Sequence, residues 1–193
     1  MKVVKFIKEN KIIIFALIVV ILSFALLALP GQFAHFGLDT PKNGHNTFKY
    51  NLSGYQFIFG TFKNPHTDAK IGGPVAQGIA AFVMLILCAA GLVFAKKSSF
   101  VSLVVSLALI VIAILFFTIS VAGSKVYTGS PDFYPASKDS TTKYSLYNWV
   151  PYVIGGLTML SGLLLFYRTF KVMKDEVKRP QQAKGPSYSY LHK

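Results

Sequence analysis

The stretch that decides the fold runs from Phe100 to Ala122 and reads FVSLVVSLALIVIAILFFTISVA. It contains no charged residue, no proline and no glycine. An α-helix needs about 20 apolar residues to cross the hydrocarbon core of a bilayer. A buried helix of a soluble protein rarely stays apolar on every face over such a length. The stretch therefore predicts a transmembrane helix.

The composition of the whole chain is typical of an integral membrane protein. Hydrophobic residues make up 53% of the 193 residues, and the mean hydropathy is +0.50. The formal net charge is +13, from 20 basic and 7 acidic residues. On a soluble protein this charge would suggest nucleic acid, but here the basic residues flank apolar segments. We therefore expect the bilayer, with anionic lipid at the cytoplasmic basic flanks, to be the partner of these charges, and no nucleic acid.

Three further apolar segments predict three more transmembrane helices. The turn between the second and third is so short that these two must be antiparallel neighbours. The expected fold class is an all-α membrane protein, an antiparallel four-helix transmembrane bundle with a small extracellular β-hairpin or sheet from the first loop. The predicted order is a basic N-terminus over 1–11, spans over 12–30, 74–95, 100–122 and 149–168, long loops over 31–73 and 123–148, a turn over 96–99, and a basic helix with a disordered tail over 169–193.

The distribution of lysine and arginine predicts the orientation of the chain. The N-terminus, the short turn and the segment after Tyr167 hold 4, 2 and 7 basic residues. The two long loops hold 4 and 3 over far more sequence. Because basic residues accumulate in cytoplasmic loops, we expect a multi-pass protein of the plasma membrane with both termini cytoplasmic and both long loops outside.

The first loop contains an aromatic pattern over 46–62 that predicts a β-hairpin. Two runs in which aromatic and polar residues alternate lie on either side of Ser53-Gly54, and such runs around a turn pair are typical of hairpins. Aromatic side chains are favoured anchors of protein interfaces, although they also form the cores of small sheets. The candidate partner-binding residues are Tyr55, Phe57 and Phe59 on one face of the second run, with Phe133 and Tyr134 in the second loop.

Small residues recur on one face of each span at spacings of 3, 4 or 7. Helices in lipid gain little from hydrophobicity and associate by close packing at small residues. A seven-residue period predicts left-handed packing at a shallow crossing angle. The candidate helix-packing residues are Gly78, Ala81 and Cys88 in the second span, Ser102, Ser106 and Ala113 in the third, and Gly155, Thr158 and Gly162 in the fourth.

Little in the sequence points to catalysis. The spans contain no Asp, Glu, Lys or His, and Arg168 lies at the end of the fourth, whereas transport pathways usually place an ionisable group at membrane depth. The single cysteine, Cys88, excludes an intramolecular disulfide. The loop histidines His35, His45 and His66 match no metal-ligand spacing. We predict a protein that is not an enzyme, with no catalytic residue, no cofactor and no metal site.

The layout of spans and loops resembles that of the claudin and peripheral-myelin-protein-like four-span membrane proteins. The resemblance covers Ile12 to Arg168 and consists of four spans, both ends inside, a long first outer loop with a hairpin and a shorter second loop. The family's first loop carries a tryptophan, a Gly-Leu-Trp triplet and two cysteines; here it has neither residue type, and Asn51 to Tyr55 (NLSGY) is the nearest counterpart of the triplet. The resemblance implies lateral assembly or adhesion through the outer sheet.

These observations favour a non-enzymatic membrane tetraspan that acts by association, with itself or with another membrane protein, through its helices and aromatic outer loops. An accessory subunit of a transport or secretion complex is the alternative. A membrane enzyme with an unrecognised site is the third hypothesis. Co-purification under mild detergent would distinguish them, because the first two require partner chains.

Overall fold

The structure is a computed structural model that describes residues 2–38, 48–63, 70, 72–128 and 148–182. Four long helices make up most of it. Along the chain, a two-stranded sheet and a short helix come between the first two long helices. The long helices are α1 (Lys2–Ala28), α3 (Ala76–Phe94), α4 (Ser99–Thr128) and α5 (Trp149–Gln182). The short elements are β1 (Ala34–Leu38), β2 (Phe48–Leu52) and α2 (Gly54–Phe59).

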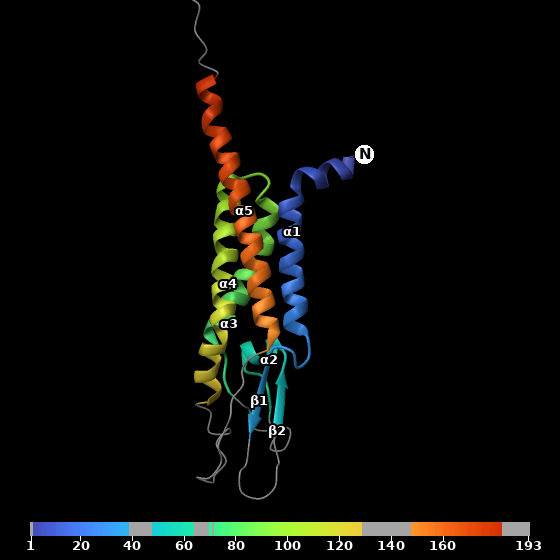
Figure 1. The fold of residues 1–193 in the computed structure, drawn as a ribbon, viewed down its shortest axis with the longest axis vertical. Coiled ribbons are helices and arrows are strands. Elements are labelled where there is room, and N and C mark those ends of the chain that lie inside the picture. The colour runs from blue at the N-terminus through green and yellow to red at the C-terminus, as the bar shows by residue number, and fades with distance from the viewer. Residues whose placement is uncertain (1, 39–47, 64–69, 71, 129–147, 183–193) are drawn as a thin grey trace, which may run out of the picture.

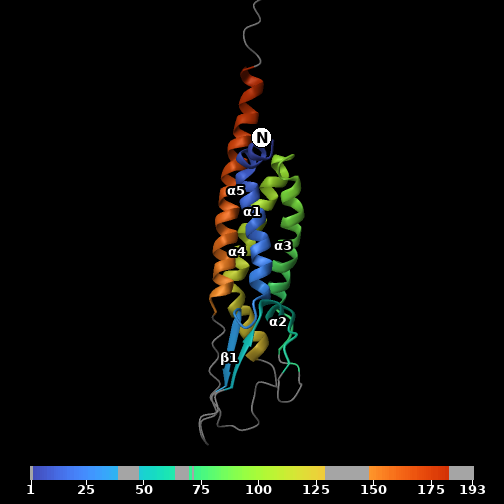
Figure 2. The same cartoon turned by 90° about the vertical axis from the view of Figure 1, so that its right-hand side faces the viewer.

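The four long helices form an antiparallel bundle (Figures 1 and 2). Helix α1 packs against α3 and α5, and α4 packs against the same two helices. One end of the bundle, here called the terminal end, holds the start of α1, the turn between α3 and α4, and the projecting end of α5 (Figure 1). The opposite end, here called the sheet end, carries β1, β2 and α2 (Figure 1).

All four long helices are long and apolar enough to cross a membrane. The qualifying segments are Asn10–Ala28, Ala76–Phe94, Ser99–Tyr127 and Trp149–Asp175. Large apolar side chains also cover their outward faces: Leu87 is 64% exposed, Val93 68% and Val121 60%. The expected four-helix, mostly helical fold is therefore confirmed, and it is compatible with an integral membrane protein.

Buried positions in α1 and α3 follow a regular alternation of three and four residues. In α3 they are Gly78, Ala81, Leu85, Cys88 and Leu92. In α1 the same alternation gives Ile13, Ala16, Val20, Ser23 and Leu27, and Val19 beside this row is buried too. An alternation of three and four averages about 3.5 residues, the spacing that keeps one seam of a helix facing its neighbour.

A two-stranded sheet from the first loop is present, but the predicted hairpin over 46–62 is wrong. Strand β2 pairs antiparallel with β1, from Ala34 opposite Leu52 to Leu38 opposite Phe48. The second predicted arm is the helix α2. The alternating aromatic pattern therefore described a strand over its first half only, because a helix cap at Ser53 starts a helix at the predicted turn.

Two long helices differ from the predicted spans at the terminal end. Helix α1 starts at Lys2 and bends at Asn10, whose backbone leaves the helical region (φ −118°, ψ 17°). The segment before the bend swings away from the bundle (Figure 1). Helix α5 continues past Pro180 to Gln182 and projects beyond the other helices (Figures 1 and 2).

Candidate functional site at the sheet end

The short helix α2 is specified by local signals at both of its ends. The Ser53 hydroxyl accepts a hydrogen bond from the backbone N–H of Gln56 (3.3 Å), and Oε1 of Gln56 accepts one from the backbone N–H of Ser53 (3.0 Å). This reciprocal pair is a capping box, which satisfies N–H groups that lack a partner at a helix start. Gly60 ends α2 in the left-handed conformation (φ 60°, ψ 39°) that glycine adopts readily.

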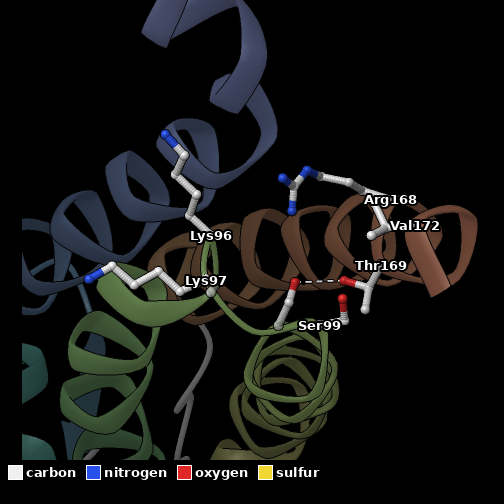
Figure 3. Close-up of a pocket in the computed structure, with 8 residues that line it drawn as sticks. Lys96, Lys97, Ser99, Arg168, Thr169 and Val172 are labelled. Carbon is white, nitrogen blue, oxygen red and sulfur yellow. Dashed lines mark hydrogen bonds between the residues drawn. The ribbon is translucent and has the colours of Figure 1, made fainter. Parts of the chain in front are cut away.

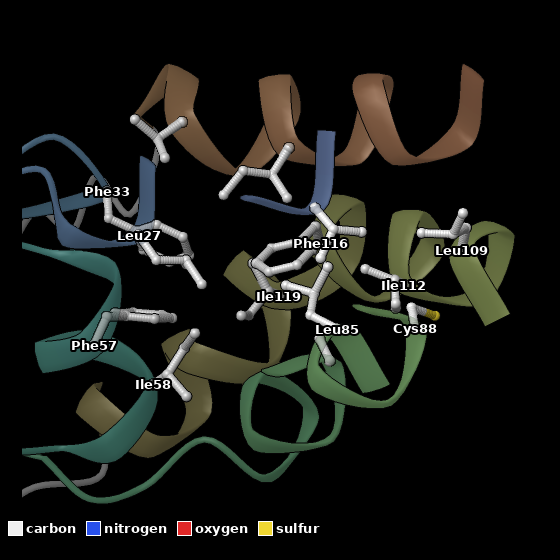
Figure 4. Close-up of a cluster of buried hydrophobic side chains, with 14 of the residues drawn as sticks. Leu27, Phe33, Phe57, Ile58, Leu85, Cys88, Leu109, Ile112, Phe116 and Ile119 are labelled. Carbon is white, nitrogen blue, oxygen red and sulfur yellow. The ribbon is translucent and has the colours of Figure 1, made fainter. Parts of the chain in front are cut away.

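Two adjacent side chains of α2, Phe57 and Ile58, fill the sheet end of the bundle, and we call them the plug. Phe57 is 1% exposed and Ile58 is fully buried. Figure 4 shows both pointing into the bundle. Glycines on neighbouring helices provide the space: a Cβ on Gly78 of α3 would lie 2.7 Å from Ile58, and a Cβ on Gly123 of α4 would overlap the Phe57 ring. The plug is therefore part of the bundle core.

Tyr127, near the end of α4, fixes the plug to that helix. Its ring stacks on Phe57, with the centroids 5.1 Å apart and the planes 7° apart. Its hydroxyl donates to the backbone carbonyl of Phe57 at 2.8 Å, so the polar tip of the buried ring is satisfied. Phe33 adds a third ring, with its centroid 5.4 Å from that of Phe57 and 6.4 Å from that of Phe116.

Hydrogen bonds connect the other long helices to the same end. The Tyr55 hydroxyl donates to a backbone carbonyl of α1 at 3.3 Å. The backbone N–H of Val75, at the start of α3, donates to the carbonyl of Ile58 at 2.8 Å. The indole N–H of Trp149, the first residue of α5, donates to Oε1 of Gln32 in the link between α1 and β1 at 3.2 Å. The sheet end therefore joins all four long helices.

A second aromatic cluster surrounds Phe82 of α3. Three rings meet it edge to face: Phe24 of α1 at a centroid distance of 5.5 Å, Tyr55 at 5.8 Å and Phe59 at 5.3 Å. Edge-to-face pairs contribute about 0.5–1.5 kcal/mol beyond the area that they bury. This cluster holds the outer side of α2 against α1 and α3.

The candidate partner-binding aromatics of the first loop therefore face the bundle. Phe57 is buried, which leaves no side-chain surface for a partner, and Tyr55 and Phe59 are half-buried against Phe82. The predicted sharing of one face by the three residues is wrong, because they lie on a helix. Phe133 and Tyr134 of the second loop lie outside the described residues.

The structure places all nine candidate helix-packing residues in buried positions. Two of them mark close approaches of α5 to α4: a Cβ on Gly162 would lie 2.9 Å from the backbone oxygen of Ser106, and one on Gly155 would lie 2.8 Å from the Phe117 ring. Their role in helix association stays a prediction. The nine residues are Gly78, Ala81, Cys88, Ser102, Ser106, Ala113, Gly155, Thr158 and Gly162.

Polar side chains also link the helices at two places. The Gln77 side-chain amide of α3 donates to Thr118 of α4 and to the backbone carbonyl of Leu115 at 3.0 Å. The hydroxyls of Ser102 on α4 and Thr169 on α5 are 2.6 Å apart in a buried contact. Hydrogen bonds between helices in lipid average about 0.6 kcal/mol. Their partners are far apart in sequence, so no local pattern revealed them.

The described residues contain no group of three or more His, Cys, Asp or Glu side chains that could hold a metal ion. His35 lies in β1, whereas His45 and His66 fall outside the described part of the chain. The chemistry displayed at the sheet end is apolar packing and backbone hydrogen bonding.

Comparison of the chain with models of protein families, with curated proteins and with solved structures finds no match. The claudin-like layout accordingly rests on the order of spans and loops alone.

Proposed function

We propose that this chain is a multi-pass protein of the plasma membrane, with both termini cytoplasmic, that acts by association with itself or with another membrane protein. The outward apolar faces of all four long helices support insertion, because side chains such as Leu87 and Val93 are exposed on the bundle. The excess of basic residues at the terminal end supports the orientation.

The observation that carries the proposal is the attachment of the sheet to the bundle. Phe33, Ala34 and Leu52 are buried, and the backbone N–H of Phe33 donates to the carbonyl of Leu52 at 3.0 Å. The sheet extends from this base beyond the ends of α1 and α5 (Figure 1). A two-stranded sheet is marginal in isolation, so its attachment to a sealed bundle end supports a stable surface there, and the proposed orientation puts this surface outside the membrane. A surface of this kind is suited to binding a partner.

The orientation is tested with cysteines introduced at one position of each end. Lys63→Cys at the sheet end should react with an impermeant thiol reagent in intact cells. Ser98→Cys, in the turn at the terminal end, should react only after the membrane is permeabilised. The native thiol gives a low background, because Cys88 is buried. Labelling of Ser98→Cys alone in intact cells would reverse the proposed orientation.

Association is tested by incorporating a photo-reactive amino acid at the exposed residues Asn51 of β2 and Lys63. Illumination of intact cells should yield a covalent adduct from these positions. The matched control is Lys97 at the terminal end, which should not give the same adduct. The mass of the adduct separates a second copy of this chain from a subunit of a larger complex. Adducts of equal yield from all three positions, or none from the sheet end, would contradict the proposal.

A further inference from the structure

An apolar groove lies between α1 and α3 at the terminal end. Its volume is about 280 Å³. The residues that line it are Asn10, Ile13, Ile14 and Leu17 from α1, and Leu92, Val93, Lys96 and Lys97 from α3 and the turn after it. Five of the eight are aliphatic. The two lysines come from the turn, which lies at the terminal end of the groove.

The groove begins where α1 bends. The bend at Asn10 turns the first residues of α1 away from α3, so the two helices do not continue side by side to the end of the bundle (Figure 1). At the sheet end the corresponding space between helices is filled by the plug and the Phe82 cluster. The groove is therefore a feature of one end of one helix pair.

A smaller basic pocket adjoins the groove. Its volume is about 100 Å³, and its lining includes Lys96, Lys97, Ser99, Arg168 and Thr169. Figure 3 shows Lys96 and Arg168 extending to the same side of the turn from two different elements. The floor is held by the buried hydrogen bond between Ser102 and Thr169, at 2.6 Å. Cations from the α3–α4 turn and from α5 therefore converge beside a fixed polar floor.

The pocket and the groove share Lys96 and Lys97, which makes them parts of one site. We propose that this site binds one acidic glycerophospholipid of the adjacent leaflet, with its phosphate at Lys96 and Arg168 and an acyl chain along Ile13, Leu17 and Val93. Basic pockets between transmembrane helices on the cytoplasmic side are suited to anionic headgroups. The aliphatic groove supplies the surface that an acyl chain requires and a soluble phosphate does not use.

The depth of the site in the proposed membrane supports this occupant. Aromatic rings are exposed at the same end: Phe94 is 58% exposed, Phe100 71% and Tyr167 67%. Amphipathic rings such as that of Tyr167 are enriched at the level of the headgroups. The cations lie at this level, and the groove extends from them toward the middle of the bundle.

The charge half of the site is tested with the double variant Lys96→Gln with Arg168→Gln. Native mass spectrometry of the full chain in detergent measures the affinity for phosphatidylglycerol against that for phosphatidylcholine. Wild-type protein should prefer phosphatidylglycerol. The double variant should bind it about tenfold more weakly, because each basic residue near an anionic headgroup adds to the free energy of binding. The matched control, Lys63→Gln with Lys125→Gln, removes two exposed charges at the sheet end and should stay within about twofold of wild type.

The apolar half is tested with Val93→Trp, which places a bulky ring in the groove. It should lose the phosphatidylglycerol adduct, whereas Val83→Trp, an outward substitution on the same helix, should retain it. Because Val93 is 68% exposed, the variant should fold; a thermal unfolding curve verifies this.

Four results would overturn the lipid site. The first is an unchanged affinity in the Lys96→Gln, Arg168→Gln variant, and the second is an equal loss in the sheet-end control. The third is full binding of phosphatidylglycerol by Val93→Trp. The fourth is binding of glycerol phosphate as tight as that of phosphatidylglycerol, which would assign the pocket to a soluble phosphate. The site lies at the opposite end from the proposed partner-binding surface, so these outcomes are independent of the cross-linking experiment.

Discussion

The two ends of the bundle are closed in different ways. At the sheet end, Phe57 and Ile58 enter from α2, and Tyr127 stacks on Phe57 and bonds to its carbonyl. At the terminal end, α4 and α5 stay joined through Ser102 and Thr169, but a groove of about 280 Å³ separates α1 from α3. The long first loop therefore gives the sheet end large interior side chains, whereas the short turn contributes only the small Ala95 to the interior of the other end.

This difference shows that the regular seam of the helices does not by itself seal a bundle. Alternating three- and four-residue spacing keeps α1 and α3 facing each other along their lengths. Where helices end or bend, the space between them must be filled by something else. At the sheet end the filler is part of the chain, and at the terminal end we propose that it is a lipid.

The largest expected effect comes from removing the plug. Phe57→Ala should lower the free energy of unfolding by about 3–5 kcal/mol, since it deletes a buried ring and leaves a cavity. Its matched control is Phe100→Ala at the terminal end, where the ring is 71% exposed and little should change. Chemical denaturation in detergent measures both. Equal losses for the two variants would abolish the distinction between a sealed end and an open one.

An intermediate effect is expected at the α4–α5 seam, which runs between the two ends. Gly162→Leu should destabilise by about 1–3 kcal/mol through overpacking, because backbone atoms of Ser106 and Ile110 face it and cannot yield as side chains do. Gly156→Leu is the control, since no atom lies within 4 Å of its added Cβ. Thermal unfolding compares them. Unchanged thermal stability of Gly162→Leu would mean that α4 and α5 are also loosely packed.

The smallest effect concerns the polar contact of the terminal end. Ser102→Ala, Thr169→Val and the double variant form a cycle whose coupling energy should be about 0.6 kcal/mol, the average for hydrogen bonds between helices in lipid. Denaturation of all four proteins measures this coupling. A coupling near zero would show that the floor of the basic pocket is not held by this bond, and the terminal end would then be looser than the structure indicates.

The helices and their buried faces were readable from the sequence, whereas the core of the sheet end was not. Cys88 and Gly162 lie on small-residue spacings that the structure buries. Tyr55, Phe57 and Phe59 have the period of a strand, yet the capping box of Ser53 and Gln56 makes them helical. That box is a local signal that could have been recognised. The pairing of β2 with β1 could not, because the strand partner lies across the intervening segment 39–47.

The sequence by itself determined the number of long helices and the faces by which they pack. Hydropathy decides the first, because about 20 apolar residues without a charge are stable as a helix in lipid. The spacing of small residues decides the second, because it permits close backbone approach. Only the tertiary structure decided what fills the bundle ends. The burial of Phe57 and Ile58 depends on space left by Gly78 and Gly123, and the groove beside Lys97 depends on a bend in a different helix. These are contacts between distant segments, which no local pattern encodes.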